Sequence, residues 1–276
     1  MKNYFDIYIV GVGGQGVLTI ADIITLTATR ENVDINYYPT KGMAQRGGFV
    51  KAQLRIGRAP DTFSPSISQR SADLVVSMEL CETLRAIRYA KPDAEYVVLG
   101  EKWLPTDVML GHGAYPEKET VCSEIQKAGG SYSYIRSEDV PSYARPNLFV
   151  LGVIFANTAL RNLFSVADIE ETIANRWPKV AESNLKTFRA GLAYAAEKAE
   201  LIERSERQAE DNESGCNVFP EEHGGIWFRF PRKAGKRAGA SPDGGRYGDD
   251  LCGQSQGLGR GSRAGIYLDS GNRRAG

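Results

Sequence analysis

The chain has 276 residues, and its 34 Lys plus Arg balance 34 Asp plus Glu, so the formal net charge is zero. This length allows a sizeable core, in one large domain or two small ones. The balanced charge gives no global argument for a nucleic-acid partner or an anionic membrane, and neither is expected.

The first predicted element is a strand over 5–11, which runs into a glycine-rich loop and then a helix from residue 17. The loop residues are Gly11, Gly13, Gly14, Gln15 and Gly16. Glycine permits a tight turn and a close approach of ligand to backbone. A helix beginning at about Gln15 would direct free N–H groups and its positive dipole end into the loop. The pattern favours an anion site, and a tight turn that binds nothing is the alternative.

A dinucleotide site would also need an acidic residue at the tip of the second strand. The second strand is predicted over 33–38, and its tip reads Tyr-Tyr-Pro-Thr. Asp34 falls inside this strand rather than at its end. The dinucleotide interpretation therefore lacks its second requirement.

The next loop, 39–48, carries Arg46, Gly47 and Gly48 and leads into an alternating strand over 49–57. Arg46 could pair with a phosphate or carboxylate, and the glycines would let a ligand or partner chain lie against the backbone. A mobile surface loop with a solvated arginine explains the same residues equally well. The link is too short for a crossover helix, so the strand over 49–57 is expected to run antiparallel.

The rest of the chain alternates between strands and helices. Predicted strands cover 73–78, 96–100 and 132–135, and predicted helices cover 79–90, 117–127, 147–163, 166–176 and 179–202. Ser165 and Asp168 have the spacing of a capping box for the helix at 166. The alternation predicts an α/β fold, a three-layer α/β/α sandwich around a largely parallel, mixed, Rossmann-like sheet.

The composition changes after Arg204. Residues 1–204 are predicted to form the domain, and 205–276 a low-complexity, disordered tail, because too few apolar residues remain to offset chain entropy. Its Arg-Gly content only weakly suggests RNA binding. No secretory signal is recognised, and the longest apolar run, near 148–156, is too short to span a bilayer.

The cysteines are far apart and form no CxxC pair. They are Cys81, Cys122, Cys216 and Cys252. This spacing argues against a disulfide scaffold, a zinc site and a self-contained iron–sulfur site, so no metal ligands are assigned. Reduced thiols and a cytoplasmic location are expected.

Two glycine motifs together resemble a known family. Gly-Val-Gly-Gly-Gln-Gly at 11–16 and Gly-Met-Ala-Gln-Arg-Gly-Gly at 42–48 resemble the gamma-type module of the 2-oxoacid:ferredoxin oxidoreductases. The second string is typical of the beta subunits of the indolepyruvate subtype. Residues 73–79 and 184–191 extend the resemblance, which covers roughly 4–200.

The resemblance implies a subunit of a complex that oxidatively decarboxylates a 2-oxoacid, an arylpyruvate in the indolepyruvate subtype. Such complexes reduce ferredoxin and deliver the acyl group to coenzyme A. Thiamine diphosphate and iron–sulfur clusters are implied for the larger alpha subunit, and no cofactor for this chain alone. Catalytic residues stay unassigned.

The implied cofactor-binding residues are those of the two glycine loops. They are Gly11, Gly13, Gly14, Gln15, Gly16, Arg46, Gly47 and Gly48. They would serve either the phosphates of coenzyme A or the interface with the larger subunit, and both roles stay open. A free-standing nucleotide- or coenzyme-binding protein is the alternative, and the missing acid at the second strand's tip argues against it.

Overall fold

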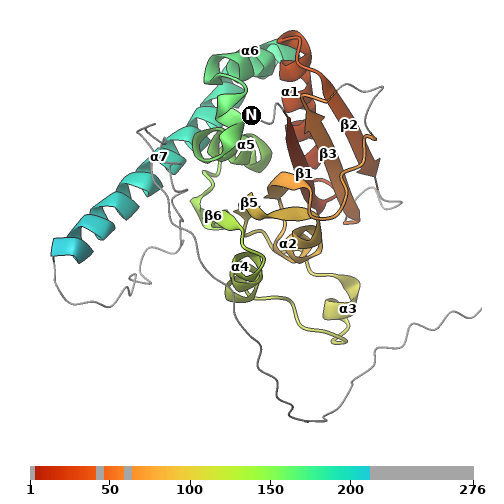
Figure 1. The fold of residues 1–276 in the computed structure, drawn as a ribbon, viewed down its shortest axis with the longest axis vertical. Helices are drawn as coiled ribbons and strands as arrows, with labels where there is room; N and C mark the ends of the chain where they lie inside the picture. Colours follow the sequence, from red (N-terminus) through yellow and green to blue (C-terminus); the bar gives the residue numbers. More distant parts are fainter. Residues whose placement is uncertain (1–3, 42–46, 59–63, 212–276) are drawn as a thin grey trace, which may run out of the picture. The chain divides into compact units, whose positions relative to one another are not determined.

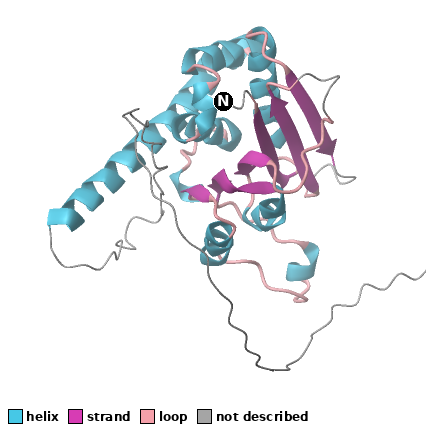
Figure 2. Ribbon diagram, in the orientation of Figure 1, coloured by secondary structure: helices cyan, strands magenta, loops and turns pink. Residues whose placement is uncertain are grey.

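The computed structural model describes residues 4–41, 47–58 and 64–211. The strands are β1 (Phe5–Val12), β2 (Ile35–Lys41), β3 (Phe49–Ile56), β4 (Ala72–Ser77), β5 (Ala90–Leu99) and β6 (Ser131–Ile135). The helices are α1 (Val17–Arg30), α2 (Leu80–Ala86), α3 (Thr106–Met109), α4 (Lys118–Lys127), α5 (Pro146–Asn157), α6 (Val166–Arg176) and α7 (Ala181–Asp211). Figure 2 distinguishes the two kinds of element.

The strands form one six-stranded mixed sheet in the order β2-β3-β1-β4-β5-β6. β1, β4, β5 and β6 pair in parallel, whereas β3 runs antiparallel to both β1 and β2. The predicted α/β class and the antiparallel direction of the third strand are confirmed. The short link between β2 and β3 leaves no room for the crossover helix that a parallel pair requires.

Helices cover both faces of the sheet. α1, α5, α6 and α7 enclose one core, and α2 and α4 enclose the other. Figure 1 shows α5 and α2 on opposite sides of β5. β1 supplies both cores by alternation, because Ile7 and Ile9 join the first while Tyr8 and Val10 join the second.

The first core contains a close crossing of α5 and α7. A side chain on Gly152 would collide with the carbonyl of Phe188, and one on Gly191 with the carbonyl of Phe149. Two helix backbones can approach this closely only where both helices lack a Cβ atom. The glycine at 191 therefore has a packing role at the centre of the fold.

Three predicted boundaries are corrected. The helix predicted over 147–163 ends at Asn157, because Thr158 is extended and its hydroxyl accepts from Leu160 N–H to start a 3₁₀ turn. The helix predicted over 79–90 gives way to a 3₁₀ turn at Ile87–Tyr89. β5 then begins at Ala90 rather than 96, because Ala90 already pairs with Ala72 of β4.

The last helix extends beyond the predicted domain end. α7 continues past Arg204 to Asp211. The remaining residues, 212–276, lie outside the described part of the chain, so the predicted low-complexity tail and its boundary stay predictions. Among residues 4–41, 47–58 and 64–211, no helix combines the length and apolar character needed to cross a membrane.

Candidate functional site

The two glycine segments singled out in the sequence meet at the carboxyl end of β1. Gly13 N–H donates to the carbonyl of Gly48 at 2.8 Å, and Gly47 N–H donates to the carbonyl of Gly13 at 3.4 Å. These bonds extend the antiparallel pairing of β1 and β3 into the loops. Arg46 lies outside the described residues, so its predicted place in this site stays untested.

The sheet topology places these loops at a topological switch point, where the connections of neighbouring strands lead to opposite faces of the sheet. β1 and β4 are parallel neighbours, yet β1 leads to α1 on one face and β4 leads to α2 on the other. Connections that diverge in this way leave a crevice at the carboxyl ends of the two strands, where α/β proteins commonly bind ligands. The glycine loops border that position.

The glycines of the first loop have different roles. A Cβ on Gly11 would lie 2.9 Å from both Met78 Cβ and Val17 Cγ2, so Gly11 is required for packing. Gly16 has φ 83° and faces the Asn147 side chain without room for a Cβ. Gly14, with φ 107°, is exposed and has no atom within 4 Å of a built Cβ. It is the position in this loop where a ligand has open access to the backbone.

The loop offers hydrogen-bond donors. Gly16 precedes α1 without any side chain capping the helix. Thr19 N–H donates to the carbonyl of Gly16 at 3.0 Å, which leaves the Val17 and Leu18 amides of the first turn as donors. Gln15 Oε1 accepts from Val12 N–H at 2.7 Å, which fixes the side chain. Its Nε2 is buried and has no hydrogen-bond partner among the described residues. Uncapped backbone amides at the start of a helix suit an oxyanion.

A buried carboxylate lies on the β4 side of this switch point. Glu79 follows β4, is 1% exposed, and accepts from Glu82 N–H at 2.8 Å and from Trp103 N–H at 3.1 Å. The Tyr115 hydroxyl also donates to it. The helix predicted over 79–90 includes Glu79 and gives it no role in the site. An acid directly after a buried strand, at the carboxyl edge of the sheet, is the signal that could have identified it.

Two groups near Glu79 have raised pKa values, the Glu101 carboxyl and the Tyr115 hydroxyl. Burial raises the pKa of the Glu101 carboxyl, and the Glu79 charge adds to the rise. The Gln15 side-chain amide interacts with this carboxyl and opposes the rise. Burial and the bond to Glu79 also raise the pKa of the Tyr115 hydroxyl. At neutral pH Tyr115 therefore stays a donor.

In the described ranges, no group of three or more His, Cys, Asp or Glu side chains is arranged to hold a metal ion. Cys81 and Cys122 are free, and burial raises the pKa of both thiols. Cys216 and Cys252 lie outside the described residues.

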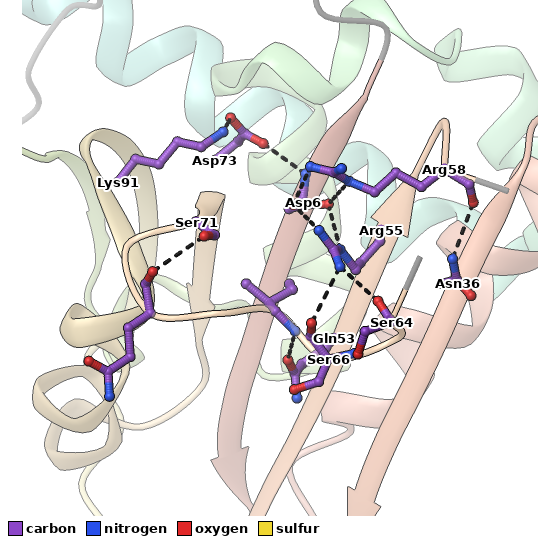
Figure 3. Close-up of polar contacts among 12 residues, drawn as sticks. Asp6, Asn36, Gln53, Arg55, Arg58, Ser64, Ser66, Ser71, Asp73 and Lys91 are labelled. Atoms are coloured by element: carbon purple, nitrogen blue, oxygen red, sulfur yellow. Dashed lines mark hydrogen bonds and ion pairs between the residues drawn. The ribbon is translucent and has the colours of Figure 1, made fainter. Parts of the chain in front are cut away.

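A polar network, drawn in Figure 3, occupies the opposite, amino end of the parallel strands. Asp6 is fully buried and accepts from both Arg55 and Arg58 at 3.1–3.3 Å. Its N–H donates to Asp73, which pairs with Lys91. The network ties β1, β3, β4 and β5 together. Because its charges are paired within the fold, we assign it a structural role.

The position of Asp34 bears on the dinucleotide interpretation. β2 begins at Ile35, so Asp34 lies at the amino edge of the sheet, away from the glycine loops. The other end of β2, where a ribose-binding acid would be required, is Lys41. The structure thus supports the argument against a dinucleotide site.

Comparison with known proteins identifies the class. Residues 6–194 match the pyruvate ferredoxin/flavodoxin oxidoreductase family, and the chain belongs to that family. It is a subunit of a 2-oxoacid:ferredoxin oxidoreductase, an enzyme assembled from several subunits.

A more specific similarity comes from one relative. Over 195 residues the chain is 30% identical to indolepyruvate oxidoreductase subunit IorB of Archaeoglobus fulgidus. The match covers 69% of this chain and 94% of that protein. The family resemblance of the two glycine motifs is therefore confirmed.

Two solved structures share the fold. The pyruvate oxidoreductase subunit PORC of Thermotoga maritima matches with a TM-score of 0.50 at 20% identity, over 69% of this chain and 96% of that chain. The 2-oxoglutarate:ferredoxin oxidoreductase of Magnetococcus marinus, solved with 2-oxoglutarate, coenzyme A and succinyl-CoA bound, matches with a TM-score of 0.53 at 18% identity. That match covers 71% of this chain but 32% of the other.

Proposed function

We propose that this subunit binds the phosphates of coenzyme A at its paired glycine loops, in a complex that oxidises indolepyruvate or a related arylpyruvate. The observation that carries the proposal is the pairing of Gly13 with Gly47 and Gly48 beside the uncapped start of α1. An oxyanion at this position meets amide donors and the positive end of a helix of 14 residues.

The comparisons supply the rest of the support. The similarity to IorB and the Gly-Met-Ala-Gln-Arg-Gly-Gly string at 42–48 favour the indolepyruvate subtype. The fold relative solved with coenzyme A bound shows that this ligand occurs in an enzyme of related architecture. Arg46, next to Gly47 in the sequence, is the proposed cationic partner of a phosphate.

The proposed division of labour follows from the family resemblance. This chain would hold and orient coenzyme A, while thiamine diphosphate and iron–sulfur clusters would be bound by a larger alpha subunit, and ferredoxin would accept the electrons. The described site residues offer backbone amide donors and the hydrogen-bonded Glu79 carboxylate, and no group of metal ligands is found among the described residues. We infer a cytoplasmic complex in which the isolated chain is colourless and does not reduce ferredoxin.

The test uses the reconstituted complex with substitutions at two exposed glycines. Gly14→Ala adds a methyl group to the open face of the loop, and Gly57→Ala, with φ 75°, introduces similar backbone strain at the opposite edge of the sheet. We expect Gly14→Ala to raise KM for coenzyme A about tenfold while Gly57→Ala leaves it unchanged. Equal KM values for both variants would contradict the proposed site.

A second variant separates the two roles left open for Arg46. If Arg46 holds a phosphate, Arg46→Ala removes a charged hydrogen bond of about 1.5–3 kcal/mol, roughly tenfold to a hundredfold in affinity. KM for coenzyme A then rises while subunit association is unchanged. Weaker association, with KM restored by excess partner, would instead place Arg46 at the interface.

A further inference from the structure

The segment between β5 and α4 exposes several large apolar side chains within eight residues of sequence. Trp103 and Leu104 are each 47% exposed, Met109 is 64% exposed and Leu110 is 62% exposed. We refer to these four residues as the α3 patch. Four of the ten exposed large hydrophobic residues in the described chain fall within this short segment. Clustering of this kind marks an interaction surface, whereas single exposed apolar residues need no explanation.

The segment is held in place rather than loosely attached. Near its start, Trp103 N–H donates to Glu79 Oε1, and Leu80 N–H donates to the carbonyl of Glu101 at 3.1 Å. Near its end, the Tyr115 hydroxyl donates to the same Glu79 oxygen. One buried carboxylate therefore anchors both ends. A surface ordered in advance loses less conformational entropy when a partner binds.

Within the segment, backbone hydrogen bonds fix the turn that carries the patch. Leu110 N–H donates to the carbonyl of Thr106 at 2.9 Å, and His112 N–H donates to the carbonyl of Asp107 at 2.8 Å. Figure 1 shows α3 beyond α2, away from the sheet. The apolar side chains of Met109 and Leu110 are thus presented outward by a closed turn instead of covering the protein's own core.

One residue of the α3 patch, Trp103, borders the candidate site. The indole of Trp103 lies against Gly47, 3.2 Å from where a Cβ of that residue would be. Gly47 in turn bonds to Gly13 of the first glycine loop. A partner that covers Trp103 therefore comes up to the edge of the glycine loops.

We propose that the α3 patch docks onto the partner subunit that carries the decarboxylation chemistry, where an apolar depression receives Met109 and Leu110. The inference rests on the proposed function, because the thiol of a coenzyme A held at the glycine loops must reach an acyl group on that partner. The partner must then lie beside the loops, and the apolar surface bordering them is the α3 patch. Since the chain is a subunit of an assembled enzyme, it must bury some surface of this kind.

The experiment compares glutamate substitutions at exposed apolar residues inside and outside the α3 patch. Leu110→Glu and Met109→Glu alter the patch, whereas Leu163→Glu alters an exposed leucine that follows the 3₁₀ turn after α5. Association with the separately purified partner subunit is measured by biolayer interferometry, with melting temperatures confirming folding. We expect each patch variant to raise Kd by roughly tenfold to a hundredfold, the loss expected for one buried apolar side chain. The control should change Kd less than about twofold.

The outcomes distinguish this inference from the proposed function. At saturating partner concentration, Leu110→Glu should leave KM for coenzyme A unchanged, whereas Gly14→Ala should raise it without changing Kd for the partner. Unchanged Kd in both patch variants would overturn the docking surface whatever the coenzyme A result. The surface is also overturned if the free chain sediments as a dimer that Leu110→Glu dissociates without affecting partner binding, since a second copy would then be the occupant.

Discussion

The buried Glu79 carboxylate is expected to stabilise both the start of α2 and the segment that follows β5. It accepts hydrogen bonds from two backbone N–H groups and from the Tyr115 hydroxyl, with 1% of the residue exposed. Glu79→Gln keeps the shape but leaves one acceptor oxygen and turns the other position into a donor. At least one buried N–H or O–H then faces a donor group.

The magnitude follows from the number of bonds affected. A hydrogen bond to a charged group contributes about 1.5–3 kcal/mol, and leaving a buried donor unsatisfied costs about 1–3 kcal/mol. We therefore expect Glu79→Gln to lower the free energy of unfolding by about 2–5 kcal/mol. For a domain of this size that corresponds to a fall in Tm of roughly 5–15 °C.

The assay is calorimetric melting at pH 7, with Glu124→Gln as the matched control. Glu124 is half exposed and pairs with Lys127 on the surface of α4, so its loss should cost less than about 1 kcal/mol. Hydrogen exchange should also become faster at residues 103–110 in Glu79→Gln. Equal Tm values for the two variants, with unchanged exchange, would refute the assignment of Glu79 as the anchor.

Three further predictions address other parts of the chain. Gly152→Ala should destabilise the fold by about 2 kcal/mol or more in urea denaturation, because a methyl group there meets the backbone of α7; an unchanged midpoint would contradict the close crossing. Burial raises the pKa of Glu95 from 4.5 to about 7. Between these two pH values the folded chain therefore keeps a proton that the unfolded chain releases. Its contribution to stability is therefore present at low pH and falls as pH rises through 7. Glu95→Gln retains an acceptor for Ala159 N–H and should flatten this decline in Tm between pH 5 and 8, whereas the same slope in both proteins would show that Glu95 does not titrate there. Truncation after Asp211 should leave Tm within about 2 °C of the full chain, because the removed residues are poor in apolar side chains; a drop of several degrees would show that they pack on the domain.

Much of the fold could be predicted because local pattern and global structure agree. The capping box of Ser165 and Asp168 is present, since it depends only on residues three apart. The strand predicted over 5–11 is likewise present as β1, because an apolar run suits a strand that is buried on both faces. Boundaries failed where a tertiary contact overrides local preference, as at Ala90, which extends β5 by pairing with Ala72.

The site was predicted in part. The motif pointed to both glycine loops, and their hydrogen-bonded pairing is now explained by the continuation of β1 and β3. The sequence could not separate Gly11, which is needed against Met78, from Gly14, which is open, because that distinction depends on residues far along the chain. Glu79 was missed for the same reason, since two of its three donors come from the segment after β5.

The most direct test of the central claim is a cryo-EM map of the reconstituted complex with coenzyme A bound. We predict density for the coenzyme A phosphates within hydrogen-bonding distance of the backbone at Gly14 and the first turn of α1, with Arg46 closing over them. A map in which coenzyme A is bound elsewhere, and the partner subunit covers the glycine loops, would contradict the account.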